Sequence, residues 1–277
     1  MRVRSSDGVE LQVHDLRGDG PPLVLVHATG FHGRVWEPLA SNLTGFHCWS
    51  IDMRAHGDST APVDRPLEWQ GFADDILAVV DALGLDRPFG VGHSKGGASL
   101  LLAEQHRPGT FRALYLYEPV VMTPEYATGR PTENVLSAGA LRRRDTFDSH
   151  DHAFENYASK PPFSSLDPDA LRLYVDHGFA FTDDGSVTLK CRPEHEAEVY
   201  AHGSAHHAFR ALDEVRCPVT IALGVEDSVP AIFGRPIADA LPAGTIASFP
   251  DLAHFGPLED PATIAASVMA AFEGVER

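Results

Sequence analysis

The chain has 277 residues, of which 43% are hydrophobic and 22% charged, and these fractions are typical of a folded globular protein rather than a disordered one. No stretch approaches the roughly 20 consecutive apolar residues that span a bilayer, and the first ten residues lack the apolar core of a signal peptide. We therefore expect a cytoplasmic protein without a membrane segment. The formal net charge of −17 would repel phosphate backbones and slow the capture of strongly anionic substrates, so nucleic acid is not an expected partner.

The cysteine and histidine content gives little support for a metal site. Cys48, Cys191 and Cys217 form no CxxC pair, so neither a disulfide framework nor a zinc site is indicated. His202 and His206 have the i, i+4 spacing of a helical zinc pair, but no third ligand stands at a suitable spacing. We expect no metal.

Short strands and amphipathic helices alternate through the first 120 residues, which is typical of an α/β fold. Residues 9–13 alternate as an antiparallel strand does, whereas residues 23–26 form a continuous apolar run, as in a parallel strand buried on both faces. The pattern then predicts, in chain order, a strand at 46–51, a helix from Phe72 that ends at Gly84, a strand at 89–91, a helix at 98–105 and a strand at 111–117.

After this strand the simple alternation stops until a strand at 219–223, a gap of roughly 95 residues that is too long for a loop. Helical patterns at 169–175 and 194–209 predict a mostly helical cap in this gap. The α/β pattern resumes with a strand at 246–249 and a last helix that begins at Asp260-Pro261. We expect a core made of residues 1–121 and 213–277, with the cap at 122–212.

The strongest local signal is a GxSxG motif at 92–96, followed by Gly97, between a predicted strand and a predicted helix. Such a turn holds Ser94 in a strained backbone conformation, and the glycines remove Cβ atoms that would clash where strand and helix approach. The serine oxygen then lies at the N-terminus of the helix, where backbone N–H groups can stabilise an oxyanion. The motif predicts a serine nucleophile.

A serine hydroxyl is a poor nucleophile at neutral pH, so it needs a base and an acid that orients the base, and both follow the serine along the chain in this architecture. His254 lies in a loop between the last predicted strand and the last helix. We expect His254 to take the proton from Ser94 and to return it to the leaving group. Asp227 follows the strand at 219–223 and is expected to fix the tautomer of His254, with Glu226 as the alternative acid.

An oxyanion hole requires two backbone N–H donors, one from the residue after the nucleophile and one from the loop after an earlier strand. Lys95 and Thr29 occupy these two positions. Loss of one such donor in a comparable site lowers the rate by about 10²–10³. The loop that holds Thr29 is therefore expected to form part of the catalytic site.

Five motifs in a fixed order make the chain resemble the α/β-hydrolase-fold serine hydrolases, in the branch that includes small esterases, cofactor-free haloperoxidases and C–C bond hydrolases. They are the oxyanion loop at 27–33, a DxRxxGxS segment at 52–59, the elbow at 92–97, a GxxD segment at 224–227, and His254 followed by PLEDP at 257–261. The resemblance implies a mostly parallel central sheet flanked by helices, with the cap inserted after the sixth strand. It also places the acid at the third residue after the strand-ending glycine, which favours Asp227.

Two departures from the family pattern concern the site itself. Ala28 and Ala55 stand where the family usually has glycine, and Lys95 replaces the usual Met, Gln or Leu after the nucleophile. Because a lysine beside the nucleophile needs a partner, we hypothesise an ion pair between Lys95 and Glu118 beneath the site.

The surroundings of the site are predicted in less detail. We expect Phe31, His32 and Phe255 to line the pocket, although His32 could equally face solvent. The charged runs at 142–144 and at Glu194, Glu196 and Glu198 are read as solvated faces.

These residues predict a cofactor-independent serine hydrolase that cleaves a small ester or related acyl compound through an acyl-enzyme intermediate. A second hypothesis keeps the same triad for C–C bond cleavage in a diketone-type substrate. A third is a ligand receptor or regulator built on the same fold. A small-molecule substrate is the expected partner, with neither nucleic acid nor a membrane, and the pattern does not specify the oligomeric state.

Overall fold

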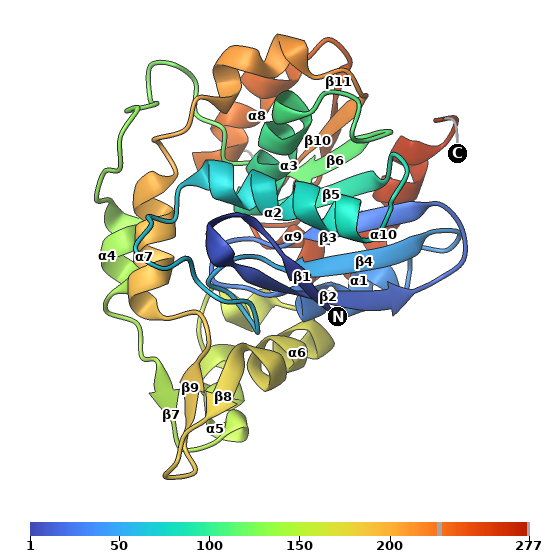
Figure 1. Ribbon diagram of the computed structural model, residues 1–277. Coiled ribbons are helices and arrows are strands. Elements are labelled where there is room, and N and C mark those ends of the chain that lie inside the picture. Colours follow the sequence, from blue (N-terminus) through green and yellow to red (C-terminus); the bar gives the residue numbers. More distant parts are fainter. Residues whose placement is uncertain (226–228, 276–277) are drawn as a thin grey trace.

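A computed structural model describes residues 1–225 and 229–275 and is built around an eight-stranded sheet (Figure 1). The strand order is β1-β2-β4-β3-β5-β6-β10-β11. The strands are β1 (Arg2–Arg4), β2 (Glu10–Arg17), β3 (Pro22–Val26), β4 (His47–Asp52), β5 (Phe89–His93), β6 (Leu114–Tyr117), β10 (Val219–Leu223) and β11 (Gly244–Ser248). Strand β2 pairs antiparallel with β1 and β4, whereas all pairs from β4 to β11 are parallel. The predicted change from antiparallel to parallel pairing is confirmed.

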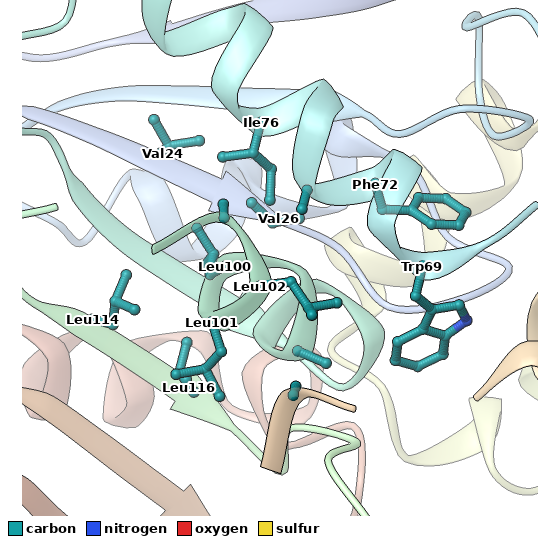
Figure 2. Packing of buried hydrophobic residues seen from close by; sticks show 14 of the residues in the cluster. Val24, Val26, Trp69, Phe72, Ile76, Leu100, Leu101, Leu102, Leu114 and Leu116 are labelled. Carbon is teal, nitrogen blue, oxygen red and sulfur yellow. The ribbon is translucent and has the colours of Figure 1, made fainter. Parts of the chain in front are cut away.

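Helices cover both faces of this sheet, as the continuous apolar runs of its strands require. One layer contains α2 (Trp69–Ala82), α3 (Lys95–His106) and α8 (Val229–Ala240), and the other contains α1 (Glu37–Ala40), α9 (Gly256–Glu259) and α10 (Pro261–Phe272). Val24 and Val26 of β3 point to the α2 and α3 layer (Figure 2), whereas Leu23 and Leu25 point to the α10 layer. Successive side chains of a strand point to opposite faces of the sheet, so each strand contributes to the hydrophobic core on both faces.

The segment between β6 and β10, which we call the insertion, packs against both cores, and its labelled elements lie at the left and bottom of Figure 1. Its elements are α4 (Val135–Ala140), β7 (Thr146–Phe147), α5 (His150–Ala158), η3 (Phe163–Ser165), α6 (Pro168–Gly178), β8 (Phe179–Phe181), β9 (Val187–Leu189), α7 (Pro193–His202) and η4 (Ala208–Glu214). Two further short helices, η1 (Ser6–Gly8) and η2 (Gly33–Trp36), belong to the first part of the chain. The cap boundaries at 122 and 212 stay a prediction.

The insertion differs from the predicted cap in two respects. A small antiparallel sheet, in the order β7-β9-β8, was not predicted, because each of its strands has only two or three residues. The helix predicted at 194–209 ends at His202, because Gly203 follows and disfavours continuation. In the described ranges no helix is long and apolar enough to cross a membrane.

Candidate active site

The turn between β5 and α3 holds Ser94 in a conformation that few L-residues adopt. Its φ of 54° and ψ of −116° lie outside the helical and strand regions. A Cβ on Gly92 would stand 2.7 Å from the Cα of Gly97, and a Cβ on Gly96 would stand 2.1 Å from the carbonyl oxygen of Val26. Only glycine fits at these two positions, so the sequence GxSxG builds a sharp strand-to-helix turn with the serine at its tip.

His254 lies in the loop between β11 and α9 and is fixed against this turn. The Nε2 atom of His93 is 2.7 Å from the carbonyl oxygen of His254, and the centres of the two rings are 4.9 Å apart. Within residues 1–225 and 229–275, no hydrogen bond joins the Ser94 hydroxyl to His254. In enzymes without substrate such contacts are often long and tighten in the complex.

The Nδ1 atom of His254 is held by a carboxylate that the sequence did not assign to catalysis. Glu118 follows directly after β6, is wholly buried, and places its Oε2 atom 2.6 Å from the Nδ1 atom of His254. Its Oε1 atom accepts a hydrogen bond of 3.0 Å from the backbone N–H of Gly224. The backbone of Glu118 has a φ of 42°, in the left-handed region. This carboxylate is therefore placed against His254 as the acid is against the histidine of a serine–histidine–acid arrangement.

The two acids predicted for this role, Asp227 and Glu226, lie outside the described residues. The hypothesised ion pair between Lys95 and Glu118 is wrong. The Nζ atom of Lys95 is buried with no hydrogen-bond partner among the described residues, and it lies 4.1 Å from the centre of the Phe72 ring in the α2 layer. Burial lowers the pKa of Lys95 to about 7, against the opposing effects of Cys191 and Asp75. The side chain of Lys95 thus points to the α2 layer rather than to Glu118.

Of the two residues predicted to form the oxyanion hole, Lys95 directly follows Ser94, and Thr29 lies in the loop after β3. In the described part of the chain, the backbone N–H groups of Thr29 and Lys95 have no hydrogen-bond acceptor. The loop of Thr29 is supported by the buried ring of His27, whose Nδ1 is 2.7 Å from the carbonyl oxygen of Ala28 and whose Nε2 accepts from the N–H of Met53. Burial holds the pKa of His27 well below its ordinary value, so the ring is neutral and can accept this bond.

Comparison with known proteins agrees with this architecture. A family model described as alpha/beta hydrolase fold matches residues 21–154. The (E)-2-((N-methylformamido)methylene)succinate hydrolase of Acinetobacter baylyi is 35% identical over 213 residues, which cover 76% of this chain and 74% of that relative. The chain belongs to the α/β-hydrolase family.

Other relatives of this α/β-hydrolase are more distant or match a smaller part. Human monoglyceride lipase is 33% identical over 147 residues, and the match spans about half of each protein, 50% of this chain and 48% of the lipase. The crystal structure of E-2-(acetamidomethylene)succinate hydrolase superposes with a TM-score of 0.83 over 99% of both chains at 22% identity, which supports the fold. These relatives are hydrolases, and the chain is an α/β-hydrolase enzyme.

A cavity of about 770 Å³ in this hydrolase opens beside the oxyanion loop and extends under the insertion. Its aromatic wall comes from both parts of the chain: Phe31 and Phe255 belong to the core, and Tyr157, Phe163 and Tyr174 come from the insertion. The rings of Phe31 and Phe255 are 5.2 Å apart. His32, which we expected beside them, is not among the residues that line this cavity, because its ring is buried with Nε2 3.2 Å from the carbonyl oxygen of Tyr174.

Two charged residues of the cavity wall were not predicted from the sequence to lie there. Arg143 and Glu196, expected on solvated faces, are paired with each other and only 16% and 8% of their side-chain surfaces are exposed. Arg143 also donates to the hydroxyl oxygens of Tyr157 and Tyr174, at 2.9 and 2.7 Å. The sequence offers no periodic signal for this cluster, since its members come from α5, α6, α7 and the segment after α4.

Proposed function

We propose that this hydrolase cleaves a small ester or related acyl compound through an acyl-enzyme intermediate, with Ser94 as nucleophile, His254 as base and Glu118 as the acid that orients the base. The main support is the 2.6 Å contact between Glu118 and the Nδ1 atom of His254. Because Nδ1 is engaged by the carboxylate, Nε2 is the nitrogen left to receive the serine proton.

In this mechanism the Ser94 oxygen attacks the acyl carbon while its proton passes to Nε2 of His254. The negative charge on the carbonyl oxygen is stabilised by the backbone N–H groups of Thr29 and Lys95. The imidazolium then protonates the leaving alcohol or amine, and the acyl group stays on Ser94. A water molecule, deprotonated by His254, attacks the acyl-enzyme and releases the carboxylic acid and the free serine.

The relatives' names agree with acyl-group chemistry. One is a hydrolase of a compound with an N-methylformamido group, and another is a lipase of monoglycerides. The substrate proposed here is a small molecule held in the cavity, and the proposed location is the cytoplasm.

The test is to treat the purified protein with an alkyl fluorophosphonate, to record the intact mass, and to measure turnover of a series of short-chain p-nitrophenyl esters. We expect one covalent adduct and ester turnover in the wild type, and neither in Ser94→Ala. An absence of both in the wild type would contradict the proposal and favour the receptor hypothesis. Cleavage of a diketone-type substrate without ester turnover would favour C–C bond hydrolysis.

A further inference from the structure

The cavity wall has the opposite sign of charge to the whole molecule. The chain contains 22 basic and 39 acidic residues, for a formal charge of −17. The charged residues that line the cavity are nevertheless three cations, Arg143, Arg144 and Lys160, and one carboxylate, Glu196. A local excess of positive charge in a strongly acidic protein favours an anionic ligand at that place.

Arg143 is the most firmly held of these cations. Its Nη1 atom pairs with Glu196, and its Nη2 atom donates to the hydroxyl oxygens of Tyr157 and Tyr174. Although burial alone would lower it, the pKa of Arg143 is raised well above its ordinary value by Tyr174, Glu196 and Tyr157, so the guanidinium keeps its charge. A guanidinium fixed in this way is pre-organised for a planar anion such as a carboxylate.

The two tyrosines add further donors on the same wall. A hydroxyl that accepts a hydrogen bond from an arginine still has its own proton to donate. Among the described residues neither Tyr157 nor Tyr174 has an acceptor for that proton. Burial raises the pKa of Tyr174 well above its ordinary value, so this residue remains a donor at neutral pH. The wall around Arg143 is therefore rich in hydrogen-bond donors, and the carboxylate of Glu196 is the charged acceptor in the cavity lining.

This donor-rich wall lies beside the loop that contains Thr29 and Gly30. The Oε1 atom of Glu196 and the Nη1 atom of Arg143, two residues that pair with each other, are 2.7 and 3.5 Å from the point where a Cβ on Gly30 would stand. Gly30 follows Thr29, the proposed oxyanion residue. Thr29, Gly30 and Arg143 line the same cavity. A single small molecule in this cavity can thus contact both the loop of Thr29 and the guanidinium of Arg143.

We propose that the substrate carries a carboxylate remote from the bond that is cleaved, and that Arg143, with the hydroxyls of Tyr157 and Tyr174, binds this carboxylate. Arg144 and Lys160, which are exposed, attract the anion to the cavity. The inference rests on the proposed acyl-hydrolase function and specifies its substrate class as carboxylate-bearing acyl compounds.

The test uses two substrates that differ only in charge: 4-nitrophenyl hydrogen adipate, which has a free carboxylate, and its methyl ester, which is neutral. After subtraction of the uncatalysed rates, we expect the wild type to prefer the anionic ester by roughly 10- to 100-fold in kcat/KM, mainly through KM. The loss of one hydrogen bond to a charged group changes a binding constant by a factor of this order.

The decisive variant is Arg143→Met combined with Glu196→Gln, which removes both charges and leaves no unpaired charge in the buried pair. We expect it to lose most of the preference while its Ser94 still reacts with the fluorophosphonate. Arg172→Met is the matched control, since Arg172 lies in the same insertion, on α6, and pairs with Asp151 at 3.0 Å outside the cavity lining. This control should keep the preference.

Binding of adipate itself, measured by calorimetry on wild type and double variant, gives a readout that does not depend on turnover. Equal kcat/KM for the two esters in a wild type that labels at Ser94 would overturn the carboxylate inference and leave the proposed function intact. Failure of Ser94 to label would contradict the proposed function. In that case, adipate binding that is present in the wild type and lost in the double variant would still support the anion site. If the double variant does not fold, Arg144→Met with Lys160→Met must lower the preference several-fold, and an unchanged preference would overturn the inference.

Discussion

A single buried carboxylate determines which nitrogen of His254 is available to Ser94 in the proposed mechanism. Glu118 accepts from the Nδ1 atom at 2.6 Å, and its other oxygen is held by the N–H of Gly224. A carboxylate can only accept at this position, so the proton stays on Nδ1 and the lone pair stays on Nε2. The orientation of His254, and in the proposed mechanism its basicity toward Ser94, therefore depend on Glu118.

The variant Glu118→Gln should lower kcat by roughly 10²- to 10⁴-fold, because an amide nitrogen opposite Nδ1 favours the wrong tautomer while the size of the side chain is kept. The measurement is ester turnover, with circular dichroism to verify the fold. Glu118→Asp should retain part of the activity, since it keeps an acceptor at this place. A larger loss in Asp227→Asn than in Glu118→Gln would instead assign the acid role to Asp227.

At this scale the sequence was informative where a residue's role follows from a local motif. The strained turn at Ser94 was predicted correctly from its glycines, because their requirement comes from close backbone approach. The place of Glu118 depends on side-chain direction at the end of β6: its carboxylate reaches His254, 136 residues away, rather than Lys95. No local sequence pattern predicts whether the buried carboxylate of Glu118 pairs with His254 or with Lys95.

The turn between β5 and α3 is the element on which the site depends. A Cβ on Gly96 would overlap the carbonyl oxygen of Val26 in the neighbouring strand, and backbone in the middle of a sheet cannot move aside cheaply. The helical residue Gly139 in α4 offers a contrast, because a Cβ there meets no atom within 4 Å.

Gly96→Ala should destabilise the protein by at least about 3 kcal/mol or prevent folding, whereas Gly139→Ala should be neutral or stabilise it by up to about 1 kcal/mol through helix propensity. Urea denaturation of the two variants measures the difference. Because both changes add the same methyl group to a helical glycine, similar stabilities would show that the close approach at Gly96 is not a constraint.

The elements of the core were largely predictable, and those of the insertion were not. Strands such as β3 carry a continuous apolar run because the sheet buries both of their faces, and α10 begins where Asp260 caps it by accepting from the N–H of Thr263. In the insertion, strands of two or three residues are too short to show a period. Arg143 and Glu196 are paired across 53 residues, a distance over which no pattern in the sequence links them.

The whole molecule combines a formal net charge of −17 with a buried lysine that has no hydrogen-bond partner among the described residues. The ammonium of Lys95 contacts the face of the Phe72 ring, which compensates only part of the lost hydration. Burial depresses its pKa from 10.5 to about 7. The stability of the entire fold is therefore linked to the titration of this one group.

Lys95→Met should stabilise the protein most at low pH. Between pH 7 and about 10.5 the unfolded chain binds a proton at Lys95 that the folded protein does not, so the free energy of unfolding of the wild type rises with pH across this window and is lowest below it. The variant lacks this dependence and keeps an apolar stem against Phe72. Its advantage in free energy of unfolding should be on the order of a few kcal/mol at pH 6.5 and should shrink steadily toward pH 10.

Urea denaturation at several pH values measures this advantage. Lys160→Met is the control, since the exposed ammonium of Lys160 is hydrated in both the folded and the unfolded state. A difference between Lys95→Met and wild type that is constant with pH, or a variant less stable than wild type at pH 6.5, would mean that the folded protein accommodates the charged lysine at no cost.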